Sequence, residues 1–332
     1  REFTIKSMAI DRDSVLNDPY CGSSDLNNKI IRCGGDPEKR FTEDPLRILR
    51  ALRFSSRLAF DIEKNTEAAI FSKFSLLENI SIERIQAELS GILVGQNAES
   101  TLRKYSEVIF FILPELRVMY NCPQETKYHK YDVWEHTLHS IGFADQDINL
   151  RLCMLFHDSG KPALKTFEDN GVAHFYKHEY KSAEITEHAL RRLRYPNNTV
   201  ENVSKLVRMH SIITPLKDLK VKRMISEHGY DFFFDLMKIK TYDTKAQSDF
   251  VLDERLPGIE KNIFYAKTLQ NENACLSLKE LAVSGDDLIR EGFSSGKNLG
   301  TVLNELLDLV ITGNAPNDKV RLIKIAKRRL EK

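Results

Sequence analysis

The feature that most constrains the fold of this chain is the recurrence of apolar side chains at helical spacing over most of its length. The pattern covers residues 42–93, 133–247 and 259–332. Apolar residues that recur every three to four positions are typical of amphipathic helices that bury one face. Alternation typical of strands is confined to residues 1–10 and to the two arms around Asn170-Gly171, a dipeptide that favours a hairpin turn. The sequence therefore predicts a mainly α-helical protein.

Composition excludes several classes of protein. The 332 residues suffice for about two domains, and no stretch approaches the roughly 20 apolar residues of a membrane span. Five cysteines are scattered without a CxxC pair, which excludes a disulfide framework or a zinc ribbon and favours a reduced, cytoplasmic location. With 49 basic and 48 acidic residues, bulk charge neither favours nor excludes nucleic acid, so local patches must decide.

An arginine ridge lies in the segment TEDPLRILRALRF. Arg47, Arg50 and Arg53 are spaced three apart and share one side of the predicted helix, opposite its leucines. The ridge is either a solvated face or a binding surface. In the second case, a carboxylate and a guanidinium together read the edge of cytosine or adenine, which presents an amine beside a ring-nitrogen acceptor. Further arginines would hold a triphosphate.

A second set of residues combines histidines with aspartates. A lone histidine is usually a packing or surface residue, but here a His-Asp pair ends an apolar helix, and the other members lie on other predicted helices. Imidazole and carboxylate ligands together suit divalent transition metals. The set is His136, His157, Asp158, His178, His210 and Asp243.

Four segments resemble, in order and spacing, the motifs of class II CCA-adding tRNA nucleotidyltransferases and of the similar bacterial poly(A) polymerases. They are REFTIKSMA, NDPYCGSSDLNNKIIR, RFTEDPLRILRALRF and ISIERIQAEL. The resemblance implies that Asp44 and Arg47 form the amino-acid template that selects CTP and then ATP. It implies that Arg50 and Arg53 contact the nucleotide, and that Arg1 belongs to the strand that lines the same site.

The resemblance also sets an expectation for the transfer chemistry. The family's Gly-Gly motif and the Asp-x-Asp pair that holds two Mg²⁺ ions stand upstream of the segment REFTIKSMA. Two Asp-x-Asp matches in this chain, at 11–13 and 145–147, lack that context. We therefore expect the chain to lack the N-terminal catalytic part of the head and to transfer nucleotides only when that segment is supplied. Glu2, where the family usually has Asp, puts sugar recognition there in question.

The histidine set resembles the HD superfamily of metal-dependent phosphohydrolases, and in particular the HD domain of many bacterial CCA-adding enzymes. HDSGK, with His136 upstream and DTKAQ downstream, carries the resemblance. It implies that His136, His157, Asp158 and Asp243 bind one divalent ion. His178 and His210 match the extra ligand positions of those members of the superfamily that bind a second ion, and Lys161 would orient a phosphate. Hydrolysis of a phosphoester at an RNA end and a purely structural metal site both remain open.

These resemblances predict four segments and one main function. The segments are a remnant of an α/β nucleotidyltransferase head (1–34), a helical neck (35–125), an HD domain (126–250) and a helical tRNA-binding tail (251–332). The expected function is CCA addition to tRNA from CTP and ATP, with Mg²⁺ for transfer and a transition metal in the HD site, and without membrane or DNA partners. The alternatives are a poly(A) polymerase-like enzyme, an enzyme that adds only part of CCA, an HD phosphohydrolase with a vestigial head and a non-catalytic tRNA-binding subunit.

Overall fold

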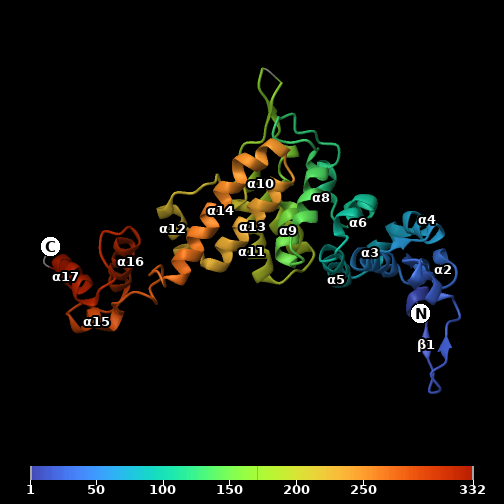
Figure 1. Cartoon of the computed structure of the whole chain (residues 1–332), viewed down its shortest axis with the longest axis horizontal. Helices are drawn as coiled ribbons and strands as arrows, with labels where there is room; N and C mark the ends of the chain where they lie inside the picture. Colours follow the sequence, from blue (N-terminus) through green and yellow to red (C-terminus); the bar gives the residue numbers. More distant parts are fainter. Residues whose placement is uncertain (1, 170, 331–332) are drawn as a thin grey trace. The chain divides into compact units, whose positions relative to one another are not determined.

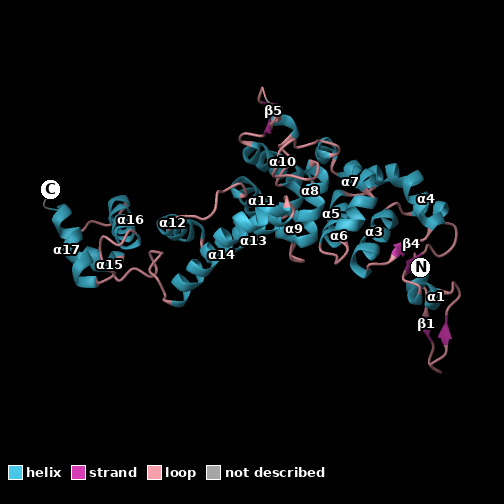
Figure 2. Ribbon diagram, turned by 45° about the horizontal axis from the view of Figure 1, so that its top comes forward, coloured by secondary structure: helices cyan, strands magenta, loops and turns pink. Residues whose placement is uncertain are grey.

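The computed structural model describes residues 2–169 and 171–330 and is mainly helical (Figures 1 and 2), as the periodicity predicts. The chain divides into two compact units. The first takes the chain up to Ile212 together with Lys238–Leu252, and the second takes Ile213–Met237 and the chain from Asp253 onward. Because this division does not test the four segments expected from the sequence, those segments stay a prediction.

The helices of the first unit are α1 (Gly22–Asn27), α2 (Pro37–Glu43), α3 (Leu46–Leu58), α4 (Lys64–Lys73), α5 (Ile82–Leu93), α6 (Ala98–Lys104), α7 (Ser106–Ile112), α8 (Val133–Phe143), α9 (Ile148–Phe156), α10 (His178–Arg192) and α11 (Asn197–Met209). Short 3₁₀ helices are η1 (Thr4–Lys6), η2 (Phe74–Asn79), η3 (Pro114–Met119) and η4 (Pro162–Leu164). The second unit contains α12 (Asp218–His228), α15 (Gly285–Arg290), α16 (Lys297–Ile311) and α17 (Lys319–Leu330). The division falls within α13 (Tyr230–Lys245) and α14 (Asp249–Asn271).

The described strands are all two residues long and pair in twos. The antiparallel pairs are β1 (Ala9–Ile10) with β2 (Leu16–Asn17), and β5 (Thr166–Phe167) with β6 (Ala173–His174); β3 (Ile30–Ile31) and β4 (Asp61–Ile62) run parallel. The β5–β6 pair confirms the predicted hairpin, although Asn170 of its turn lies outside the described residues.

The prediction of a single strand over residues 1–10 is wrong. Phe3 makes an isolated bridge to Cys33, and the chain then turns through η1 before β1 begins. The alternation is misleading because Thr4 is buried beside Phe3, its hydroxyl donating a 2.7 Å hydrogen bond to Asp25. A polar side chain with a buried partner breaks the inside–outside pattern on which the prediction rests.

The neck helix α3 packs against α5 and so fixes the arginine ridge. Leu46, Leu49 and Leu52 of α3 are buried, as the helical spacing predicts. Gly91 of α5 allows a close approach, since a Cβ there would lie 2.4 Å from Cδ of Arg53. We infer that the ridge is held between two helices and is not a freely solvated face.

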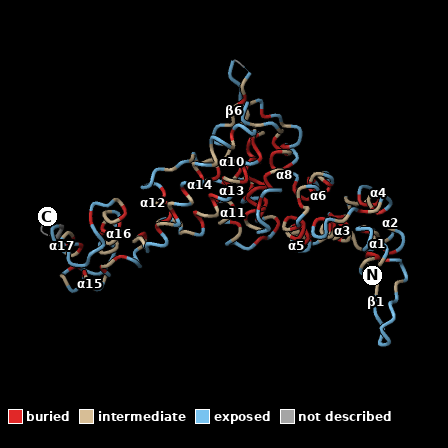
Figure 3. Tube along the Cα trace, viewed as in Figure 1, coloured by how far each residue is buried: buried red, intermediate tan, exposed pale blue. Residues whose placement is uncertain are grey.

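The apolar helix α9 carries the His-Asp pair into the core of the first unit. Every residue from Leu150 to Phe156 is buried, which is typical of a helix enclosed on all sides. Figure 3 shows further buried segments in α8, α10 and α11, the neighbouring helices that bear or precede other members of the histidine set. The residues that follow α9 therefore begin inside the protein.

Residues 252–258, where the sequence predicts a joint, lie inside α14, which runs on past Pro257. The two compact units nevertheless divide between Leu252 and Asp253, at the start of this stretch. Gly258 lets the helix lie against Pro215, since a Cβ there would be 2.9 Å from the proline ring, and the Asn262 side chain bonds both backbone groups of Leu216. This packing offsets the cost of a proline inside a helix.

No helix among the described residues is long and apolar enough to cross a membrane.

One contact between α5 and the end of α10 gives a prediction on pH. The hydroxyls of Ser90 and Tyr195 lie 2.8 Å apart, and burial raises the pKa of Tyr195 from 10.0 to about 12. Above pH 10 the unfolded chain loses this proton while the folded chain keeps it, so stability must fall as pH rises. The expected slope from Tyr195 approaches 1.4 kcal/mol per pH unit by linkage. Urea unfolding between pH 8 and 11 should show a shallower decline in Tyr195→Phe; parallel curves would contradict the assignment.

Candidate functional site

The predicted template residues line one cavity in the neck. Its volume is about 460 Å³, and it is lined by Glu2, Lys6, Asp44, Arg47, Arg50 and Arg84. Asp44 stands between α2 and α3, where its carboxylate accepts a 3.3 Å hydrogen bond from the backbone of Leu46. The start of α3 therefore positions both Asp44 and, one turn later, Arg47. Arg1, predicted to line the same site, lies outside the described residues.

Each of the two template side chains already pairs with other groups of the same chain. Arg84 of α5 lies 3.2 Å from the Asp44 carboxylate. Arg47 donates 2.8 Å hydrogen bonds to Glu43 and to the backbone oxygen of Arg40, and the bond from Arg47 lowers the pKa of Glu43. A nucleotide base that uses Asp44 and Arg47 must therefore replace these contacts.

The other two predicted arginines are held by buried or half-buried acids. Arg50 donates two 2.5 Å hydrogen bonds to Glu2. Arg53 does not line the cavity and lies 3.0 Å from Glu88 of α5. Burial raises the pKa of Glu88, against the opposing effect of Arg53 and Arg50. The sequence analysis missed Glu88, although its place on the apolar face of α5, between buried Ile85 and Ile92, marks an acid that needs a partner.

The structure brings the six predicted metal ligands together in one buried cluster. In its first half, the Nε2 atom of His136 lies 3.1 Å from Asp243 and 3.3 Å from the Nε2 atom of His157. In its second half, the Nε2 atom of His178 lies 3.2 Å from that of His210. Asp158 joins the halves, with one oxygen 3.3 Å from His157 and the other 3.3 Å from His178.

Hydrogen bonds to the backbone fix which nitrogen each imidazole presents to the cluster. The Nδ1 atoms face the carbonyl oxygens of Met154, Phe175, Val207 and Ala246, at 2.6 to 3.3 Å. Because a carbonyl oxygen only accepts, each Nδ1 carries the proton and each Nε2 presents a lone pair. Facing lone pairs at 3.2 and 3.3 Å repel unless a cation lies between them. The residues therefore fit divalent ions: His136, His157 and Asp243 would hold one, and Asp158, His178 and His210 would hold another.

Charges around Asp158 keep it ionised inside the protein. Burial alone would raise its pKa, but the Lys161 ammonium beside it holds the pKa of Asp158 below its ordinary value. The Nζ atom of Lys161 lies 2.7 Å from this carboxylate and donates a 2.8 Å hydrogen bond to Gln124. Lys161 is thus at the cluster, as predicted, and Gln124 is a neighbour that the sequence analysis missed.

His129 is a second neighbour that the sequence analysis left without a role. Its ring lies 5.1 Å from that of His136, and burial, with Lys161 nearby, lowers the pKa of His129 to about 2. It is therefore neutral in the folded protein.

Among the side chains of the histidine cluster, that of His178 is the most exposed, at 13%, so a substrate would approach from that side.

Two family models match parts of the chain. Residues 171–326 match a model described as tRNA nucleotidyltransferase domain 2. Residues 59–119, which include α4 to α7, match a model described as "Probable RNA and SrmB-binding site of polymerase A". Together the two models cover residues 59–119, which follow α3, and residues 171–326, which make up most of the chain after the hairpin turn.

Curated proteins match the chain over its whole length. A CCA-adding enzyme from Ligilactobacillus salivarius is 30% identical over 332 residues, which cover all of this chain and 71% of that protein. An A-adding tRNA nucleotidyltransferase from Deinococcus radiodurans is 29% identical, over 93% of this chain and 73% of that protein. Among solved structures, the Bacillus stearothermophilus CCA-adding enzyme in complex with CTP has a TM-score of 0.66 at 24% identity, covering all of this chain and 73% of that one. By its identity to the first of these relatives over that length, the chain belongs to the family of tRNA nucleotidyltransferases that includes the CCA-adding enzymes.

Proposed function

We propose that this chain selects CTP and ATP and holds tRNA for CCA addition at the tRNA 3′ end. The names of the relatives support the reaction. The observation that carries the proposal for this chain is the shared cavity, which places Asp44 beside Arg47 at the foot of α3. The proposal assigns Mg²⁺ to the transfer step and a cytoplasmic location, where its tRNA substrate would be processed.

The chemistry of the base edges explains the selection. The Asp44 carboxylate would accept from the exocyclic amine of cytosine or adenine, while Arg47 donates to the neighbouring ring nitrogen. Uracil and guanine present a carbonyl beside an N–H, so they would set acceptor against acceptor and donor against donor. Arg84 and Arg50 lie in the same cavity and would contact the phosphates.

We propose that tRNA is held along the chain by shape and by its backbone. The predicted segments 35–125 and 251–332 would carry these contacts. Helix α17 supports this role, because Lys319, Arg321, Lys324, Lys327 and Arg328 all lie on it. Cations on one helix are suited to phosphates and carry no sequence preference.

A second candidate function, phosphoester hydrolysis at RNA ends, is favoured by the histidine cluster. His136, His157, Asp158 and Asp243 would hold one divalent transition metal, and Asp158 with His178 and His210 would hold another. Bound there, divalent metals supply Lewis acidity and a nucleophilic water. Lys161 would orient the phosphate, and the carbonyl bonds of the imidazoles keep their nitrogens aimed at the ions. A structural site is the competing interpretation, since nearly all of the ligands are buried.

Titration of the four nucleoside triphosphates into the chain tests the main proposal. We expect CTP and ATP to bind about tenfold or more tightly than UTP and GTP, the discrimination of one good base-edge pair. Selective binding of ATP alone would favour the poly(A) polymerase-like or A-adding alternative. Equal binding of all four would contradict a template at Asp44 and Arg47.

A further inference from the structure

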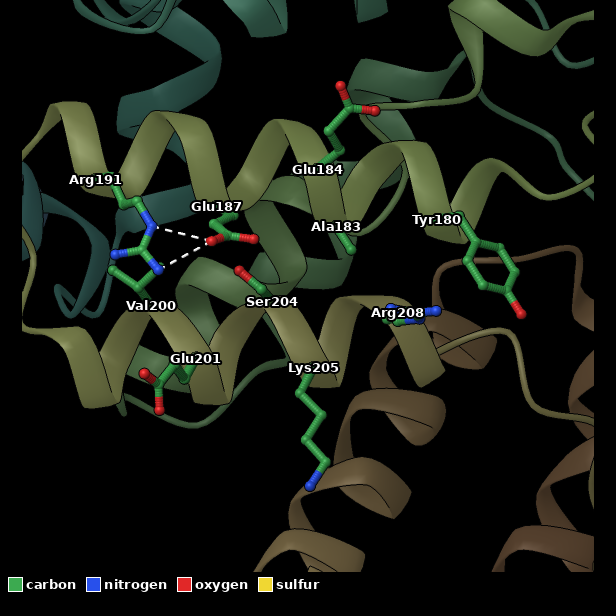
Figure 4. Close-up of a pocket in the computed structure, with 10 residues that line it drawn as sticks. All are labelled: Tyr180, Ala183, Glu184, Glu187, Arg191, Val200, Glu201, Ser204, Lys205 and Arg208. Atoms are coloured by element: carbon green, nitrogen blue, oxygen red, sulfur yellow. Dashed lines mark hydrogen bonds and ion pairs between the residues drawn. The ribbon is translucent and has the colours of Figure 1, made fainter.

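A groove runs between α10 and α11 on the first unit, away from both sites described above. Its volume is about 420 Å³, within the range of ligand pockets. Figure 4 shows Tyr180 and Arg208 close together at one end of the groove, and the ion pair of Glu187 with Arg191 towards the other.

The groove lies on the opposite side of these helices from the metal cluster. Tyr180 is two residues after the ligand His178, and Arg208 is two residues before the ligand His210. Helical side chains two positions apart point to opposite sides. Accordingly, His178 faces Asp158 inside the protein while Tyr180 as a residue is 52% exposed. The groove is therefore a separate feature of the same two helices.

The side chains of the groove combine a stacking surface with polar groups. The Arg208 guanidinium lies 4.8 Å from the centre of the Tyr180 ring, and an aromatic ring beside an arginine is suited to stack an unpaired base. The Ser204 hydroxyl on the groove wall is shielded from solvent and has no hydrogen-bond partner among the described residues. Glu201 is exposed on the α11 side, where a carboxylate can accept from a base amine.

We propose that this groove binds an amine-bearing nucleobase, adenine or cytosine, of the single-stranded 3′ end of an RNA. The base stacks on Tyr180, Glu201 accepts from its exocyclic amine, and Arg208 with Lys205 contacts the neighbouring phosphate. The identity of the RNA rests on the proposed function, since the three bases of a CCA end all carry such an amine. The binding chemistry of the groove does not depend on the neck template.

Fluorescence polarisation with two labelled trinucleotide RNAs, CCA and UUU, tests the proposal on the whole chain, because uracil has no exocyclic amine. We expect CCA to bind about tenfold more tightly than UUU. Tyr180→Ala should weaken CCA binding by about tenfold, the effect of losing one stacked base. Glu201→Ala should remove the preference for CCA while binding of UUU persists. Phe250→Ala, which removes an aromatic ring of similar exposure, 48%, outside the groove, should leave both affinities unchanged.

The Asp44→Ala variant separates this proposal from the main one. If the groove is the site, Asp44→Ala still prefers CCA to UUU and Glu201→Ala does not, and this holds even if the four triphosphates fail to show a template. If Tyr180→Ala binds CCA as well as the wild type does, the groove proposal is wrong, whatever the triphosphates show. If Asp44→Ala removes the preference instead, the RNA end binds at the template and the groove proposal is wrong.

Discussion

Replacing Asp158 with asparagine is expected to abolish binding of both divalent ions in the histidine cluster. Asp158 is the one ligand shared by the two halves, with an oxygen directed at each. The substitution keeps the shape and removes the negative charge. It also leaves Lys161 buried without its 2.7 Å partner, and such a loss typically costs about 3–5 kcal/mol of unfolding free energy.

Metal content by mass spectrometry after loading with Mn²⁺ or Zn²⁺ checks this prediction. The wild type should hold two ions per chain and Asp158→Asn none. His178→Ala should retain one ion, because His136, His157, Asp243 and the shared Asp158 all remain. His188→Ala, an exposed histidine of α10 outside the cluster, is the matched control and should retain both. Unchanged metal content in Asp158→Asn would refute a bridging role.

Replacing Asp44 with alanine is expected to remove the preference for CTP over UTP. The carboxylate is the group that distinguishes the amine of cytosine from the carbonyl of uracil, so a preference worth about 1–3 kcal/mol should collapse towards equal affinity. The triphosphate contacts of Arg50 and Arg84 survive, so binding of CTP weakens but does not vanish. Arg84 also loses its ion pair with Asp44, which costs little because that pair is exposed.

Parallel titrations of CTP and UTP into three proteins provide the measurement. They are the wild type, Asp44→Ala and Asp13→Ala; the last removes an exposed carboxylate in the turn between β1 and β2. Asp13→Ala should keep the wild-type preference. If Asp44→Ala keeps it too, the template assignment is wrong.

The sequence predicts residues whose roles follow from local spacing. His157 and Asp158 could be placed because they end a largely apolar helix, and Arg47 and Arg50 because they share a helical ridge with Arg53. The resemblance to the HD superfamily then indicated which residues belong together, and the structure brings all six predicted metal ligands together. The separation of Arg53 from the cavity could not be predicted, because it depends on how α3 meets Glu88 and Gly91 of α5.

Contacts between segments far apart in the sequence explain the features that the sequence analysis missed or predicted wrongly. Thr4 is buried because Asp25 accepts a hydrogen bond from its hydroxyl, and Gln124 contacts the histidine cluster through Lys161. Neither partner is visible in the local pattern of polar and apolar residues. Likewise, the helical pattern of the sequence is interrupted before residue 259, yet packing of Gly258 against Pro215 keeps α14 continuous past Pro257.

Displacement of labelled CTP by unlabelled ATP is the most direct test of the central claim that one template in the neck reads both nucleotides. If Asp44 and Arg47 serve cytosine and adenine in turn, ATP displaces all of the bound CTP with one-to-one stoichiometry, while UTP at the same concentration displaces little. If CTP and ATP bind together without competition, or if UTP displaces CTP as well as ATP does, the cavity at the foot of α3 is not the nucleotide-selecting site.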